Sequence, residues 1–145
     1  MTDQPKARQR TRPTFVQIAT ALQTASLFFQ AVTAGLLLSS AHGELLHGVG
    51  ARVMYGASML YVLAAILAWR PGGGSPRPVA HASGFLLLAS VQVVLGIARI
   101  PSVHVPLGVL MFGLSLLALG RALSAPRPAA GRSRAARTQA RSSAP

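Results

Sequence analysis

The sequence has no cysteine and only two acidic residues, Asp3 and Glu44. Without cysteine the chain can form neither disulfide bonds nor thiolate metal sites. No pair of catalytic carboxylates and no nucleophile–base pair is evident, so the sequence gives no indication of an independent enzyme. Charged residues make up only 11% of the 145 residues, against roughly a quarter in average globular domains. An ordinary soluble domain is therefore excluded.

What the chain does have is basic charge, with a formal net charge of +12. In a soluble protein this excess would favour nucleic-acid binding. Of the 14 Lys and Arg residues, however, all but Arg52 and Arg99 lie before residue 15, around the loop that holds Arg70 and Arg77, or from Arg121 onward. Basic flanks beside apolar segments are typical of the bias that keeps Lys and Arg on the cytoplasmic side of a membrane. We expect no nucleic-acid partner.

Four apolar segments account for the mean hydropathy of +0.47. They cover about residues 15–38, 45–69, 79–98 and 104–123, and a helix needs roughly 20 apolar residues to cross a bilayer. The segments are joined by "SSAHGE", "RPGGGSPRP" and "RIPS", which are short and rich in helix-breaking residues. Short connections make neighbouring helices antiparallel. The predicted fold is all-α, an integral membrane up-down four-helix bundle.

The predicted bundle, residues 15–123, is flanked by two basic tails. Residues 1–14 form the first, and residues 124–145 lack apolar periodicity and are expected to be disordered. The charge distribution places both termini in the cytoplasm and the chain in the cell membrane, with the lipid bilayer as its first partner. The first apolar segment is longer than the 7–15 residues of a signal peptide, so we expect a retained span.

Two of the apolar segments begin alike, "HGVGARVMYGASML" at His47 and "HVPLGVLMFGLSLL" at His104. The second and fourth spans run in the same direction, so both histidines lie near the outer surface on diagonal helices. A bis-histidine heme needs one axial imidazole from each side. This pattern predicts heme b between the second and fourth spans, with His47 and His104 as metal ligands. The alternative is a duplicated packing pattern that binds nothing.

Small residues and methionines follow each histidine on the same helical face. Gly50, Ala51 and Gly108 would leave space for a flat macrocycle, and Met54 and Met111 could pack on its edge. Small residues also allow close helix packing, and methionine fills gaps in any core.

Five further polar residues lie in the same half of the membrane. Gln30 and Gln92 could hydrogen-bond a ligand or one another. Arg52 and Arg99 could pair with the heme propionates, or could extend to the membrane surface. Glu44 could accept a hydrogen bond from the second ring nitrogen of His47, or could favour the helix N-terminus through the helix dipole.

The segments "ELLHG", Glu44 to Gly48, and "QVVLG", Gln92 to Gly96, are followed by a histidine that opens the next helix. Together they resemble one four-helix half of the heme A synthase family, over about residues 27–123. The resemblance implies heme ligation by His47 and His104 and a functional role for Glu44. The chain departs from that family in having four helices instead of eight, and Gly48 where arginine usually follows the first histidine. It is equally similar to small uncharacterised four-helix bacterial membrane proteins.

Two functional hypotheses follow from the sequence. The first is a heme-b-binding membrane protein that transfers electrons or handles heme. The second is a cofactor-free structural or partner-binding membrane protein. The sequence leaves open whether a second copy of the chain or another membrane protein is a partner.

Overall fold

The structure is a computed structural model that describes residues 13–70 and 75–124, and in this part of the chain it contains four helices and no strand. The helices are α1 (Phe15–Leu37), α2 (Gly43–Trp69), α3 (Arg77–Ile97) and α4 (Pro101–Ser124). Each is long and apolar enough to cross a membrane. The all-α four-helix prediction is confirmed, and the fold is that of a multi-pass membrane protein. Apart from residues 13, 14 and 124, the two predicted tails lie outside the described residues.

The observed helices agree with the predicted spans to within a few residues, and two of the earlier starts, those of α3 and α4, are at proline. Pro76 precedes α3, and Pro101 is the first residue of α4. Proline is well tolerated in the first turn of a helix, because the N–H that it lacks would have no partner there. His104 therefore lies in the first turn of α4 and does not open it.

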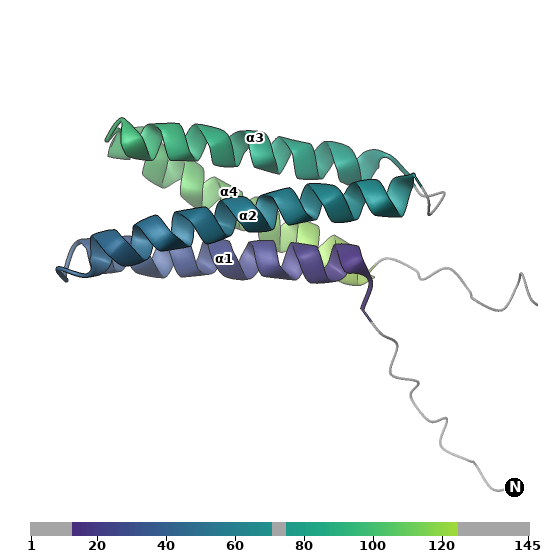
Figure 1. Cartoon of the computed structure of the whole chain (residues 1–145), viewed down its shortest axis with the longest axis horizontal. Coiled ribbons are helices and arrows are strands. Elements are labelled where there is room, and N and C mark those ends of the chain that lie inside the picture. The colour runs from purple at the N-terminus through teal and green to yellow at the C-terminus, as the bar shows by residue number, and fades with distance from the viewer. Residues whose placement is uncertain (1–12, 71–74, 125–145) are drawn as a thin grey trace, which may run out of the picture.

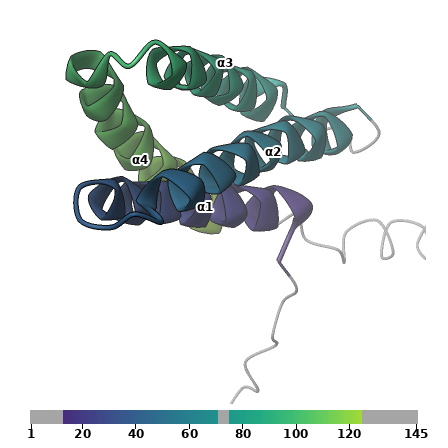
Figure 2. The same cartoon turned by 60° about the vertical axis from the view of Figure 1, so that its left-hand side comes forward.

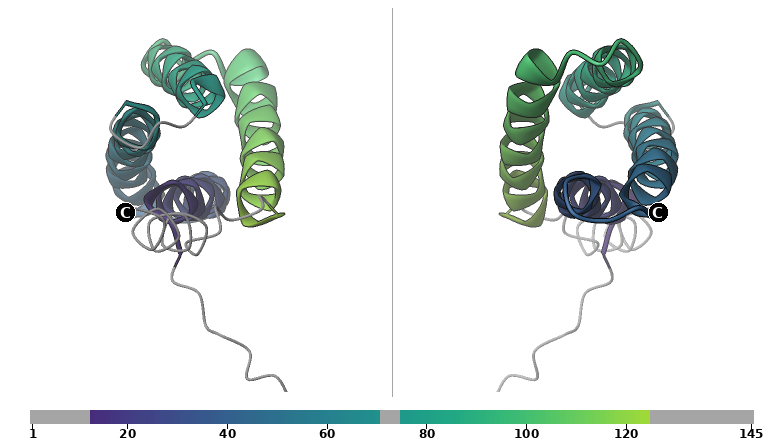
Figure 3. Two further views of the ribbon diagram at one scale, coloured as in Figure 1. Left: turned by 90° about the vertical axis from the view of Figure 1, so that its right-hand side faces the viewer. Right: turned by 90° about the vertical axis from the view of Figure 1, so that its left-hand side faces the viewer.

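The four helices surround a central space, with α2 and α4 on opposite sides (Figure 3). Within the described residues, each helix packs on its chain neighbours and α1 also packs on α4, whereas the backbones of α2 and α4 do not approach one another closely. The α1–α2 and α3–α4 connections lie at one end of the bundle, here called the histidine end (Figure 1). The start of α1, the end of α2, the start of α3 and the end of α4 lie at the other, here called the terminal end. The predicted diagonal placement of α2 and α4 is thus present.

Helix α4 is inclined across the bundle (Figure 2). At the histidine end it packs on α3, where His104 lies beside Gly96. At the terminal end it packs on α1, where the Gln17 side-chain Nε2 donates to the Ala122 carbonyl at 2.9 Å. Consequently α3 and α4 separate toward the terminal end.

Buried polar side chains lie inside this bundle beside apolar ones such as Met111 and Phe85, while most of the large apolar side chains are exposed on its outer face. Gln23 is 1% exposed and its Nε2 donates to Ser58 Oγ of α2 at 3.1 Å. Thr24 Oγ1 donates to the Ser115 carbonyl of α4 at 3.3 Å. Such interhelical hydrogen bonds hold membrane helices together, since the surrounding lipid is as apolar as leucine. The outer face is therefore suited to hydrocarbon.

Two glycines bring α1 and α2 into close contact. A Cβ atom on Gly43 would lie 2.5 Å from the Leu36 carbonyl oxygen, and one on Gly50 would lie 2.8 Å from the Gln30 amide. A side chain at Gly43 would meet backbone and push the two helices apart, whereas one at Gly50 would displace the side chains of Gln30 and Phe29. The α1–α2 pair is therefore a close-packed hairpin.

Helix α3 ends with an arginine where glycine is usual. The Ile100 N–H donates to the Leu95 carbonyl at 3.0 Å and the Arg99 N–H to the Gly96 carbonyl at 3.2 Å. This is the hydrogen-bond pattern of a Schellman motif, whose left-handed residue is most often glycine. Here that residue is Arg99, with φ of 53°. The backbone at this turn is therefore strained.

Candidate functional site

A cavity of about 770 Å³ occupies the histidine end of the bundle. Cofactor pockets have volumes of about 300–1,000 Å³, so this cavity could hold a cofactor of ordinary size. Six of the seven predicted site residues line it: Gln30, Glu44, His47, Gln92, Arg99 and His104. The four helices thus bring together residues that lie far apart in the sequence.

The two histidines face one another across the cavity from α2 and α4. Their ring centroids are 6.2 Å apart and their planes are inclined at 69°. Both side chains are half-buried. The placement of α2 and α4 on opposite sides of the bundle brings the two rings to the same cavity.

His104 is fixed by a main-chain group of α3. Its Nδ1 lies 3.0 Å from the Gln92 carbonyl oxygen. A carbonyl can only accept, so Nδ1 carries the proton and donates it. The other ring nitrogen, Nε2, is then left with its lone pair, as a metal ligand requires.

His47 is fixed by α1 in a comparable way. Its Nδ1 lies 3.2 Å from Thr33 Oγ1, and the Thr33 hydroxyl donates to the Gln30 carbonyl at 3.1 Å. With that proton on the carbonyl, Oγ1 can accept from His47 Nδ1–H, which leaves the Nε2 lone pair available. Thr33 is fully buried. In its satisfied orientation the Gln30 amide nitrogen lies 3.2 Å from the same Nδ1 and donates to it in the other tautomer. The main-chain contact therefore fixes the tautomer of His104, and the contacts of His47 allow the same one.

The two glutamines have different surroundings. In the orientation that satisfies its whole amide, Gln30 accepts from the Ala51 N–H at 2.6 Å and donates to the His47 carbonyl at 3.2 Å. Gln92 is 9% exposed, and its buried Oε1 has no hydrogen-bond partner among the described residues. The two side chains make no hydrogen bond to one another in the described structure, since α1 and α3 lie diagonally. Gln92 therefore has an acceptor left for a bound molecule or water.

Glu44 and Arg99 are exposed residues at the rim of the cavity. In the described structure Glu44 makes no hydrogen bond to His47, whose Nδ1 is bonded to Thr33 instead. Glu44 lies in the first turn of α2, where a carboxylate favours the helix N-terminus. The second of the two sequence interpretations of Glu44 agrees with this placement.

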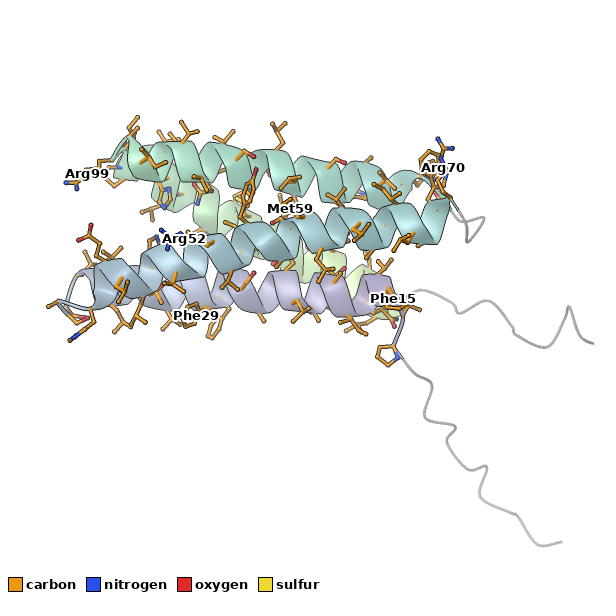
Figure 4. The ribbon with its side chains drawn as sticks, in the orientation of Figure 1. Phe15, Phe29, Arg52, Met59, Arg70 and Arg99 are labelled. Carbon is orange, nitrogen blue, oxygen red and sulfur yellow. The ribbon has the colours of Figure 1, made fainter. Side chains whose placement is uncertain are left out.

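Arg52 does not line the cavity and is exposed on α2, as is visible in Figure 4. It follows His47 by five residues, which turns it about 140° around the helix. Figure 4 also shows Arg99 and Arg70 at opposite ends of the molecule. Only Arg99 of the two outer arginines is therefore placed to contact a ligand in the cavity.

The small residues predicted to clear space are placed differently from one another. Ala51 and Gly108 line the cavity, whereas Gly50 packs on Gln30 and Phe29 in the α1–α2 contact. Met54 lines the cavity, and Met111 is fully buried in the core. The residues that follow the two histidines therefore contribute partly to the cavity and partly to the helix packing.

Sequence reasoning missed two groups that fix the histidines. Thr33 lies three residues after Gln30 on the same face of a helix, and that spacing could have drawn attention to it. The Gln92 main-chain carbonyl leaves no trace in a sequence. Gly96, against which His104 packs, enters the sequence prediction only as the last residue of "QVVLG".

Neither a cluster of metal-binding side chains in the described part of the chain nor a known relative indicates what the site binds. Within residues 13–70 and 75–124, no group of three or more His, Asp or Glu side chains could hold a metal ion. No protein-family model, curated protein or solved structure matches the chain. The function must therefore be argued from the two imidazoles and the cavity between them.

Proposed function

We propose that this membrane protein binds heme b between α2 and α4, with His47 and His104 as axial ligands. The separation of 6.2 Å between the two rings carries the proposal. Two imidazoles that bind one metal from opposite sides have centroids roughly 6 Å apart, the sum of two metal–nitrogen bonds of about 2 Å and the two ring radii. The tautomer of His104, which the contacts of His47 also allow, supports the same arrangement.

The number of protein ligands also favours heme over a free metal ion. A bare ion needs three or four protein ligands, and the described residues offer no such group. In heme the porphyrin supplies four nitrogens, so the protein has to supply only the two axial ligands. When bound, heme provides one-electron redox chemistry at its iron.

The chain's own residues would orient and enclose the group. Thr33 Oγ1 and the Gln92 carbonyl hold the imidazole planes through Nδ1, and such outer hydrogen bonds also raise the basicity of the ligating nitrogen. Arg99 at the rim would pair with a propionate, because guanidinium binds carboxylate well. Ala31, Ala34 and Gly48 line the cavity with little side-chain volume.

The cellular setting belongs to the same proposal. The basic residues flank the terminal end, so both termini lie in the cytoplasm and the histidine end lies at the outer surface of the cell membrane. We expect the protein to transfer electrons or handle heme at that surface, with a four-helix bundle that resembles one half of heme A synthase.

An absorption spectrum of the detergent-purified protein, air-oxidised and then reduced with dithionite, tests this proposal. We expect a Soret band that sharpens on reduction, and we expect it to be lost or altered in His47→Ala and in His104→Ala. His42→Ala is the matched control, because His42 is exposed, makes no capping hydrogen bond and lies outside the cavity. A protein that stays colourless when it is expressed with added heme would overturn the proposal.

The second candidate is a cofactor-free protein that binds a membrane partner, and Arg52 favours it. This arginine is exposed within α2, and a charged side chain facing lipid is costly. A carboxylate on another membrane protein would pair with it. Copurification of a partner at fixed ratio from colourless preparations, lost in Arg52→Leu, would support this candidate against heme binding.

A further inference from the structure

A second cavity, of about 740 Å³, lies at the terminal end of the bundle. It is lined by residues from the start of α1, from Pro78 to Leu88 of α3 and from the second half of α4, together with Tyr61 of α2. None of these residues lines the cavity between the histidines. It exists because α4 turns toward α1 and away from α3 at this end (Figure 2).

The two ends of this second cavity differ in polarity. Arg121, in the last turn of α4, and His81, near the start of α3, line it near the surface of the bundle. Deeper in the bundle its walls are apolar, with Phe85, Leu88 and Leu117 among them. The cavity is therefore amphipathic along the direction of the helices.

No acidic side chain of the described residues balances the charge at the polar end. Arg77, the first residue of α3, adds a third basic group near the same surface. The only acid among the described residues is Glu44, in the first turn of α2 at the opposite end of the bundle. An anion is therefore the complementary group for this end of the cavity.

The cavity is also open toward the bilayer. Leu87 and Leu117, on α3 and α4, line it and are 67% and 57% exposed. A Cβ atom on Gly84, a third residue of the wall, would meet nothing within 4 Å. A hydrocarbon chain could thus enter from the membrane between α3 and α4.

We propose that this cavity binds one anionic phospholipid. Its phosphate pairs with Arg121 and His81 at the membrane surface, and one acyl chain lies between α3 and α4 against Phe85, Leu88 and Leu117. A phospholipid matches both halves of the cavity. A free phosphate would leave the apolar walls without contacts, and a neutral quinone would leave Arg121 without a counter-charge. The proposal does not depend on heme binding.

Native mass spectrometry of the full chain tests this inference. The probe is an equal mixture of phosphatidylglycerol and phosphatidylcholine with the same acyl chains, added to the protein in detergent. We expect one phosphatidylglycerol to be retained in preference to phosphatidylcholine. Arg121→Gln should weaken that retention by about fivefold, the effect of one basic residue near an anionic lipid. Arg70→Gln is the control at the same membrane surface, since Arg70 stacks on Trp69 and lies outside the cavity.

A second pair of variants tests the acyl-chain half. Gly84→Leu places a side chain in the cavity without a backbone clash, and it should abolish retention of the lipid. Gly120→Leu is its control, because a Cβ atom there also meets nothing within 4 Å and Gly120 does not line the cavity. Equal retention of the two lipids by the unmodified chain, equal retention by the two glycine variants, or a copurified neutral quinone in place of phospholipid would each overturn the inference.

Discussion

Each histidine at the cavity has one ring nitrogen bonded to the protein and one free. The two fixing groups differ in kind: for His104 it is a main-chain carbonyl, which no substitution removes, and for His47 it is the side chain of Thr33. The orientation of His47 can therefore be changed by a single substitution that leaves both ligands in place.

Thr33→Val keeps the shape of this buried side chain and removes the acceptor. His47 then loses the hydroxyl that lies 3.2 Å from its Nδ1, which should lower the free energy of unfolding by about 1 kcal/mol. We also expect the midpoint potential of bound heme to shift, because the ligand loses its outer hydrogen bond. Thermal unfolding and a redox titration measure the two effects.

Thr33→Ser retains the hydroxyl and serves as the control for this prediction. It should keep the unmodified potential even if it loses some stability. A Thr33→Val protein with an unchanged potential would mean that Thr33 does not position the imidazole.

Arg99 allows a prediction about strain. A left-handed conformation costs a non-glycine residue roughly 1–2 kcal/mol, so Arg99→Gly should raise the unfolding temperature of the ligand-free protein. Ala98→Gly, one residue earlier at a φ of −71°, should lower it. Thermal denaturation in detergent compares the two, and a lower stability of Arg99→Gly would contradict the prediction.

Sequence patterns identified most of the candidate site but not its hydrogen bonds. Two histidines at matching places in the second and fourth spans, which run in the same direction, are enough to predict that they face one another. The direction of Arg52 could be worked out from helical periodicity, which turns it away from the face of α2 that carries His47. The partners of His47 and His104 could not be predicted, because one is a backbone atom and the other depends on how α1 packs on α2.

Among the elements, α1 is the most firmly attached. At its start Thr14 and Gln17 form a reciprocal capping pair, with bonds of 3.2 and 2.9 Å, while Gln17 also reaches the end of α4. At its far end Gly43 lies against the backbone of Leu36. The last turn of α4 has carbonyls without intrahelical partners, and Gln17 satisfies one of them.

The Gly43 contact gives a prediction at this scale. Gly43→Ala places a methyl group against backbone, which cannot move as a flexible side chain does, so the α1–α2 pair should separate. We expect the free energy of unfolding to fall by about 1–3 kcal/mol, the usual cost of overpacking a core. Gly56→Ala is the matched control, since a Cβ atom there meets nothing within 4 Å. It should not destabilise the protein, because alanine is more favourable than glycine in a helix by about 1 kcal/mol.

Unfolding of the two alanine variants in parallel measures the difference. Equal stabilities would show that α1 and α2 have room to adjust.

The ends of the helices were predictable from the lengths of the apolar runs and the helix-breaking residues between them. The inclination of α4 was not, because it depends on long-range contacts such as that of Gln17 with Ala122.

At the scale of the whole molecule, the inclination of α4 divides the interior into two cavities, one at each end. Between them lies a buried layer with Tyr61, Ser58 and Met111. The site at the histidine end joins the first two helices to the last two, so a ligand bound there should stabilise the entire bundle.

We therefore expect added heme b to raise the unfolding temperature of the purified protein. Stabilisation by a ligand is about 2.7 kcal/mol at one hundred times its dissociation constant. His104→Ala should lose most of this effect, and iron-free protoporphyrin should not reproduce it in the unmodified chain. An equal increase with protoporphyrin would indicate apolar binding without axial ligation.

The two histidines belong to different hairpins, and this has a consequence for biosynthesis. Helices are made and inserted in chain order, so α1 and α2 can close around Gly43 and Gly50 while the rest of the chain is still on the ribosome. At that stage only His47 is present. The second imidazole arrives with the last helix, so heme would be acquired as the final step of assembly, and a prematurely terminated chain would not retain it.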